Sequence, residues 1–188
     1  MSFFVVRAME NGEHEEIDLE KGIVQVGWQV PYDLANVQDK VKMKNIVEES
    51  YYGKNSISSW KPDKGQISYV ASQLYALVNK INIGDFAVLP LKKVRNIAIG
   101  RVTGPYEFRT DIQAYYQEWE YTLFHTRPVN WFNYQLKRDD MPEEICPKRP
   151  PGGVDGLQTV YKVNPECEIA LLDQLRKRGM LSLMYGTI

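Results

Sequence analysis

The sequence predicts an α+β fold, a bent and mostly antiparallel β-barrel with flanking helices. Short runs of alternating or β-branched residues recur along the chain, and those in the second half are joined by short turns, which favours antiparallel pairing. Residues 65–81 carry apolar side chains at helical spacings of three and four. Hydrophobic residues make up 44% of the 188 residues, as is usual for a globular domain, so one such domain with a packed core is expected.

The N-terminal third contains two expected strands and one expected helix. Residues 3–8 (FFVVRA) are β-branched and aromatic, and the Asn-Gly pair at residues 11–12 marks a turn after them. Residues 23–28 (IVQVGW) form a second expected strand, which ends before Pro31. Apolar side chains at helical spacing, with lysines between them, predict a helix over residues 36–51.

The middle of the chain alternates between loops and regular elements. Residues 55–64 are rich in Ser, Pro and Gly and are expected to form a loop before the amphipathic helix 65–81. A turn at residues 83–85 leads to a short buried strand at residues 86–90. Residues 96–106 alternate apolar and polar side chains, which predicts another strand.

The last third completes the expected sheet. Residues 107–118 are polar and aromatic, which is typical of a loop or an irregular strand, and residues 120–132 alternate again as a strand. The remaining expected elements are a helical turn, a linker, a strand and a helix, at residues 138–144, 146–153, 159–163 and 166–178. The expected order is therefore β-β-α-α-β-β-β-β-α.

Charge and cysteine content restrict the class of protein. The net charge is −1, but residues 37–101 carry eleven Lys or Arg against five Asp or Glu, a local charge of +6. A basic segment fits an anionic partner and equally a solvated helix face, so both interpretations stay open.

Cys146 and Cys167 lie in unrelated contexts, which argues against a disulfide scaffold. No apolar run is long enough for a membrane helix and no secretory signal is visible, so a cytoplasmic location is expected.

The sequence contains none of the common catalytic motifs. His14 and His125 are its two histidines, and neither stands beside a nucleophile in the pattern of a catalytic triad. His14 lies in an acidic stretch and is expected to be exposed and without function. Residues 100–104 (GRVTG) lack the spacing of a phosphate-binding loop, and no metal-binding motif is present. We therefore expect no enzymatic activity, no cofactor and no metal site.

Aromatic residues are the most informative part of the composition, at 12% with four Trp. Flat ligands bind where aromatic faces converge, and a modified base in duplex DNA must be extruded to reach such a site. The candidates are Trp28, Trp60, Tyr106 and Trp119. Trp28 ends an expected strand, whereas Trp60 and Trp119 lie in polar stretches, where a large apolar ring is consistent with binding. A place in the core is the alternative for each of them, and it is the expected one for Trp131.

Four blocks occur in an order that is typical of a known superfamily: residues 3–8, 22–28, 81–90 with 97–106, and 125–131. On these blocks the chain resembles the EVE and YTH domains of the PUA-like superfamily, in particular the EVE-like modules of Mrr- and McrB-type modification-dependent restriction proteins. The resemblance implies a bent β-barrel with flanking helices and a pocket that accepts a flipped or unpaired modified base. It assigns residues 1–163 to the base-reading domain and leaves residues 164–188 as a helix or a linker to a further domain.

The resemblance also implies roles for single residues. Trp28 matches the position of a Trp that forms one wall of the pocket in YTH domains, and Trp119 or Trp60 would supply another wall. His125 and Arg127 stand where a strand could meet a phosphate or a base edge, although simple alternation of the strand explains them equally well. The basic residues expected to approach phosphates are Lys40, Lys42, Lys44, Lys61, Lys64 and Arg101.

The leading hypothesis is a reader of nucleic acid, modified DNA above all, without catalytic activity of its own. It would capture a methylated, flipped base and act as the specificity module of a restriction or defence system. A nuclease or an AAA+ ATPase, in the same or another chain, would be its partner. The alternatives are a small-molecule or nucleotide-sensing regulatory domain, an RNA-modification reader and a module that binds another protein through exposed aromatic residues.

Overall fold

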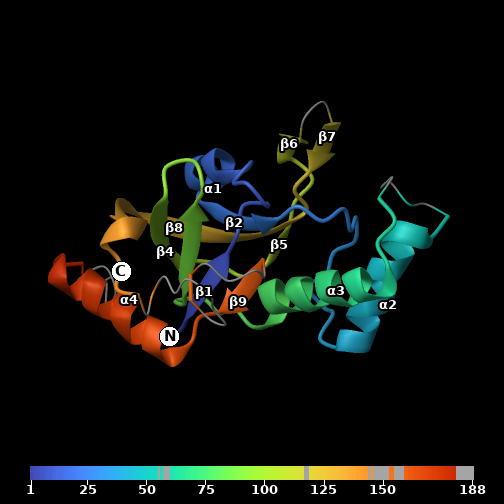
Figure 1. Ribbon diagram of the computed structural model, residues 1–188. Helices are drawn as coiled ribbons and strands as arrows, with labels where there is room; N and C mark the ends of the chain where they lie inside the picture. The colour runs from blue at the N-terminus through green and yellow to red at the C-terminus, as the bar shows by residue number, and fades with distance from the viewer. Residues whose placement is uncertain are drawn as a thin grey trace.

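The computed structural model describes residues 1–54, 56, 60–116, 119–143, 145, 153–154 and 159–180, without the side chains of Tyr116 and Trp119. Its strands are β1 (Phe3–Val6), β2 (Ile23–Val26), β3 (Phe86–Leu91), β4 (Asn96–Val102), β5 (Glu107–Phe108), β6 (Gln113–Tyr116), β7 (Trp119–Thr122), β8 (His125–Lys137) and β9 (Val160–Lys162). Its helices are α1 (Glu15–Lys21), α2 (Lys40–Tyr52), α3 (Lys64–Asn79), α4 (Pro165–Lys177) and a short 3-10 helix, η1 (Arg138–Asp140). Figure 1 shows α2 and α3 together at one end of the sheet and α4 at the opposite end.

One curled sheet forms a half-barrel, in the strand order β2-β8-β4-β3-β1-β9. The short strand β5 pairs with the beginning of β8. The strands β6 and β7 form a separate hairpin that projects from the sheet (Figure 1). The predicted α+β class is therefore confirmed, with a partial barrel flanked by helices.

The sheet is mixed rather than antiparallel, which corrects the expected strand arrangement. Strands β1 and β3 pair in parallel, with Phe3 opposite Phe86, whereas β3 and β4 pair in antiparallel. Parallel neighbours need a long crossover, and here α1, β2, α2 and α3 lie between the two strands in sequence. Both strands are buried along their whole length, so their sequences are continuous apolar runs that do not reveal direction.

The helices α2 and α3 pack against each other and against the sheet. Each begins at an aspartate whose side chain accepts a backbone hydrogen bond, from Lys42 to Asp39 at 2.7 Å and from Gln66 to Asp63 at 2.8 Å. The Gln66 side chain accepts in return from the Asp63 backbone N–H, which completes a capping box. The apolar stripe of α3, including Leu74, lies in one buried cluster with the even-numbered valines of β2.

The helix α4 packs against a second buried cluster on the sheet. Its stripe of Cys167, Leu171 and Leu175 shares this cluster with Phe3 of β1 and Phe86 of β3. The predicted helix at residues 166–178 thus covers the strands at the centre of the fold. Residues 181–188 of the expected C-terminal segment lie outside the described residues.

Three segments differ from the sequence expectation. The helix α1 is not predicted, because seven residues that include Glu15, Glu16, Asp18 and Glu20 have too few apolar side chains to show a period. The single strand expected over residues 120–132 divides into β7 and β8, because β7 pairs with β6 while β8 pairs with β2 and β4. The expected loop 107–118 contains β5 and β6. Cys146 and residues 146–152 of the expected linker lie outside the described part of the chain.

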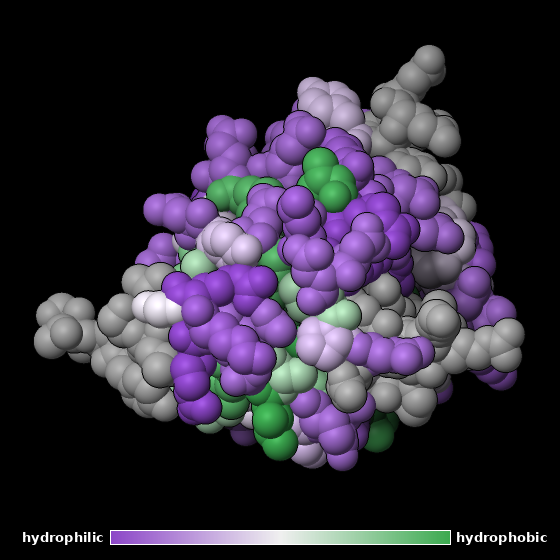
Figure 2. Space-filling view, turned by 60° about the vertical axis from the view of Figure 1, so that its left-hand side comes forward, coloured by the Kyte–Doolittle hydropathy of each residue, from purple (hydrophilic) through white to green (hydrophobic). Residues whose placement is uncertain are grey.

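The surface on the side of α4 is mainly hydrophilic. Figure 2 shows hydrophobic residues there as separate spots among hydrophilic ones rather than as one broad patch. In the part of the chain that the structure describes, no helix combines the length and hydrophobicity required to cross a membrane.

Candidate nucleic-acid interface

The strand β2 brings Trp28 to the side of α3. Side chains alternate along a strand, so Val24 and Val26 enter the core with α3, and Trp28 follows on the same face just after the strand ends. The indole of Trp28 is half-buried and stands perpendicular to the ring of Tyr69 on α3, with ring centroids 6.0 Å apart. Tyr69 is 38% exposed, and its hydroxyl lies 3.2 Å from that of Thr159. An aromatic pair therefore reaches the surface here.

A second aromatic pair lies next to the first. Tyr51, in the last turn of α2, is fully buried. Its ring stands edge-on to that of Trp60 at 5.2 Å, and Trp60 is 42% exposed. Tyr51 lies in the same hydrophobic cluster against which Trp28 packs, so the two pairs adjoin. We call Trp28, Tyr51, Trp60 and Tyr69 the aromatic row.

The electrostatic state of the aromatic row is simple. Burial raises the pKa of the Tyr51 phenol, although the hydrogen bond from Gln29 opposes this shift, so the phenol is neutral at physiological pH. The side-chain amide of Gln29 donates to the carbonyl oxygen of Thr122 at 3.2 Å, which fixes the loop to β7. Neither the Tyr51 phenol nor the Gln29 amide changes its charge near neutral pH.

Only some of the predicted basic residues lie near the row. The Lys61 amino group donates to the backbone carbonyl of Tyr51 and lies 5.6 Å from the ring centre of Tyr52. Lys64, exposed, begins α3 four residues after Trp60. These two lysines supply positive charge beside the exposed indole.

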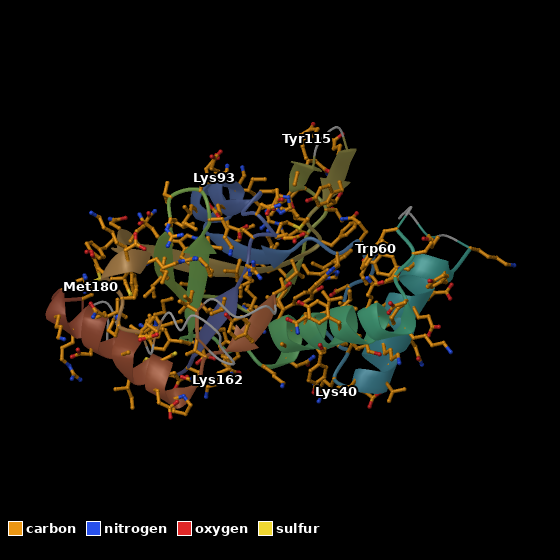
Figure 3. All side chains as sticks on the ribbon, in the orientation of Figure 1. Lys40, Trp60, Lys93, Tyr115, Lys162 and Met180 are labelled. Atoms are coloured by element: carbon orange, nitrogen blue, oxygen red, sulfur yellow. The ribbon has the colours of Figure 1, made fainter. Side chains whose placement is uncertain are left out.

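The other predicted cations lie elsewhere. Lys40 sits at the first position of α2, with its amino group 5.4 Å from the ring centre of Tyr75, and Lys42 is exposed nearby while Lys44 is half-buried. The length of α2 puts its two ends about 18 Å apart. In Figure 3, Lys40 and Trp60 lie on opposite sides of α3. Arg101 is half-buried in β4. The structure therefore does not gather all six basic residues into one surface.

Tyr106 and His125 belong to the interior rather than to the candidate interface. His125 is fully buried, and its Nε2–H donates to the Val30 carbonyl oxygen at 2.9 Å. Its Nδ1 accepts from the Tyr106 hydroxyl at 2.8 Å, and that hydroxyl accepts from the Leu34 backbone N–H at 3.3 Å. Burial lowers the pKa of His125 to about 4, while its hydrogen bond to Val30 opposes the shift. The expected contact of these side chains with a ligand is corrected to a positioning role, because they fix the loop that follows Trp28.

Arg127 also turns inward, against the expectation of a phosphate contact. Its Nε donates to the Leu77 carbonyl oxygen at 2.6 Å and one terminal nitrogen donates to that of Val78 at 2.7 Å. The other terminal nitrogen lies 3.4 Å from the Gly104 carbonyl oxygen. A cation at a helix C-terminus satisfies carbonyl groups that have no partner within the helix. Arg127 is thus 5% exposed and joins the end of α3 to the sheet.

The remaining two tryptophans, Trp119 and Trp131, lie in β7 and β8. The backbone of Trp119 is part of β7, and its side chain lies outside the described residues. Trp131 packs against the core as expected, and its indole N–H donates to the Asp18 carbonyl oxygen at 2.9 Å.

Sequence reasoning did not identify Tyr51 and Tyr69 as members of the row. Tyr69 lies on the polar face of an amphipathic helix, between the apolar positions Ile67 and Val70. An aromatic residue at such a position is a signal that could have been used. Tyr51 carried no comparable signal, because it continues the apolar face of α2.

Comparison with known proteins gives a family but no activity. The model of a domain of unknown function, DUF8426, matches residues 5–146. This range covers three quarters of the chain and includes every member of the aromatic row. No curated protein matches the sequence.

Proposed function

The chain belongs to the DUF8426 family, whose function is unknown, and we propose from the geometry of its own side chains that it binds nucleic acid. The exposed members of the aromatic row stack on an unpaired or flipped base, and Lys61 and Lys64 contact the adjoining phosphates. The observation that carries this proposal is the exposed indole of Trp60, held edge-on by a buried tyrosine beside a second, partly exposed aromatic pair.

The chemistry of the row suits a base better than an aliphatic ligand. Every nucleobase has a flat face that stacks on Trp or Tyr, and such stacking contributes about 1–3 kcal/mol per base. Enzymes and readers that act on one base in a duplex remove it from the stack. The lysines beside Trp60 favour a polyanion, and phosphate contacts of this kind position a strand without reading its sequence.

The finer part of the proposal concerns the kind of base. The resemblance of the sequence to EVE and YTH domains supports a preference for a modified, methylated base. It also supports a role as the specificity module of a restriction or defence system that works with a nuclease or an AAA+ ATPase. Trp28, just after β2, is the residue that belongs both to the blocks on which this resemblance rests and to the aromatic row.

Substitution of Trp60 tests the proposal. In a fluorescence-anisotropy titration with methylated and unmethylated oligonucleotides, single-stranded and duplex, Trp60→Ala should weaken binding by about 5- to 150-fold, which corresponds to one lost stacking contact. Wild-type affinity should fall steeply between about 50 and 200 mM salt, because phosphate contacts release counterions. Trp60 is exposed, so circular dichroism should show an unchanged fold.

Tyr115→Ala is the matched control. Tyr115 is 64% exposed on the projecting β6–β7 hairpin, away from the row (Figure 3), and its loss should leave affinity unchanged. Equal affinities of the Trp60 variant and the wild type would refute the proposal. Binding of free mononucleotides with no gain for polymers would instead support the nucleotide-sensing alternative.

A further inference from the structure

A buried polar cluster lies on the face of β2 that points away from Trp28. Its members are His14, Asp18, Gln25 and Tyr121. Gln25 is the only polar residue in β2, and its side chain enters the region beneath α1. His14, Asp18 and Gln25 are each completely buried, although two of them can carry a charge, and the expectation that His14 is exposed is therefore wrong. The cluster takes no part in the aromatic row.

Hydrogen bonds of this cluster connect α1 to three strands. The Gln25 side-chain amide donates to Nδ1 of His14 at 3.1 Å, and Nε2 of His14 lies 2.5 Å from the Tyr121 hydroxyl on β7. A nitrogen that accepts from an amide carries no proton, so His14 is neutral with its hydrogen on Nε2. The Trp131 indole on β8 donates to the Asp18 carbonyl oxygen, which makes α1 a clamp across β2, β7 and β8.

The carboxyl group of Asp18 is the exception within this network. Among the described residues, neither of its oxygens has a hydrogen-bond partner, and the same is true of Oε1 of Gln25. A buried carboxylate without donors is strongly unfavourable, whereas a neutral carboxylic acid avoids the buried charge. Glu15, one turn earlier on α1 and also buried, adds a negative charge nearby, and its carboxylate accepts from the Lys92 backbone N–H. Burial and the charge of Glu15 therefore disfavour ionisation of Asp18, although the neighbouring Gln25 amide favours it.

We propose that Asp18 is a neutral carboxylic acid in the folded protein and that α1 is a proton-dependent clamp. Loss of the Asp18 proton would release α1 from β7 and β8. The base of the β6–β7 hairpin would then lose its contact with α1. The inference stands on the burial and the missing partners of the carboxyl group, and it is independent of nucleic-acid binding.

The pH dependence follows from the two titrating groups of the cluster. Burial raises the pKa of Asp18 well above its ordinary value of 3.8, and Glu15 adds to the shift while Gln25 opposes it, so stability falls as pH rises above that ordinary value. Burial lowers the pKa of His14 below 6.5, against the influence of Glu13, so stability from His14 rises until about pH 6.5. The two effects oppose each other below pH 6.5. The contribution of Asp18 raises the unfolding equilibrium constant by up to tenfold per pH unit and levels off once the pH exceeds the pKa of Asp18 in the folded protein.

Asp18→Asn tests the proposal, because an amide has the size of a neutral carboxylic acid and does not ionise. Unfolding of the full chain in urea, followed from pH 4.5 to 8.5, should show the stability of the wild type falling with pH relative to that of the variant, up to the pKa of Asp18 in the folded protein. The variant should lack that fall and should be the more stable protein at pH 8.5. Asp140→Asn, at an exposed position in η1, should follow the wild-type profile. Amide hydrogen exchange of α1 should accelerate with pH, beyond the intrinsic rate, only where Asp18 is present.

Two results would overturn the proposal. One is a stability profile of Asp18→Asn that runs parallel to the wild type, or a variant that fails to fold, because a neutral group of the same shape should be tolerated. The other is a carbon-13 NMR titration of the wild-type protein in which the Asp18 carboxyl ionises near its ordinary value of 3.8.

Discussion

His125 shows how burial changes the meaning of a residue. Both of its ring nitrogens are bonded inside the protein, to Val30 and Tyr106, so its hydrogen-bonding capacity serves the fold. The sequence shows that His125 and Arg127 lie on the same face of a strand. It does not show which face of that strand another element covers. The helix α3, which covers this face, comes from a distant part of the chain. The candidate site was therefore predictable at Trp28 and Trp60 and not at these two residues.

The buried imidazole predicts an acid-sensitive fold. The pKa of His125 is about 4 in the folded protein against 6.5 in the unfolded chain, so the unfolded chain binds the additional proton between these values. The contribution of His125 to the free energy of unfolding should thus rise by about 3 kcal/mol as pH increases from about 4 to 6.5. Urea unfolding of the Asp18→Asn variant across this range measures this rise, together with that of His14, without the opposing effect of Asp18. An NMR titration in which the His125 ring protonates near pH 6.5 would contradict the assignment.

The best predicted elements are those whose apolar pattern is long and decides their packing. The helices α3 and α4 lie within one or two residues of the expected ranges, because each has one apolar stripe and a capping residue. The helix α1 was missed because its stability comes from contacts with the sheet rather than from its own pattern. The parallel pairing of β1 and β3 was missed because strand direction is a property of the whole chain.

Close contact between β4 and β8 requires glycine at one position. A Cβ atom on Gly100 would lie 2.4 Å from the Val129 side chain and 2.8 Å from the Asn130 carbonyl oxygen, beside the irregularity in strand register. We expect Gly100→Ala to lower the free energy of unfolding by about 1–3 kcal/mol, measured by urea denaturation. Gly65→Ala, in the exposed first turn of α3, serves as the control and should not destabilise the protein comparably. Equal effects of the two substitutions would show that packing is not the cause.

At the scale of the whole molecule, α4 and the half-barrel should unfold as one unit. Leu171 is fully buried in a cluster that includes Phe3 of β1. Leu171→Ala should therefore cost about 2–5 kcal/mol and shift the transitions seen by tryptophan fluorescence and by circular dichroism together. Ile169→Ala, at a 68% exposed position of the same helix, should have little effect. A fluorescence transition that stays unchanged in Leu171→Ala would mean that residues 164–180 behave as a separate unit.

The position of β1 between β3 and β9 has a consequence for how the chain reaches its native state. The partners of Phe4 are Ala87 on one side and Lys162 on the other. The pairing of β1 therefore cannot form until segments much later in the chain have been synthesised. Such distant pairings give a high contact order, and proteins of this kind fold in milliseconds to seconds rather than microseconds. During translation, the apolar run at residues 3–6 is synthesised long before its partner strands, so its pairing can form only after residues 160–162 have been made.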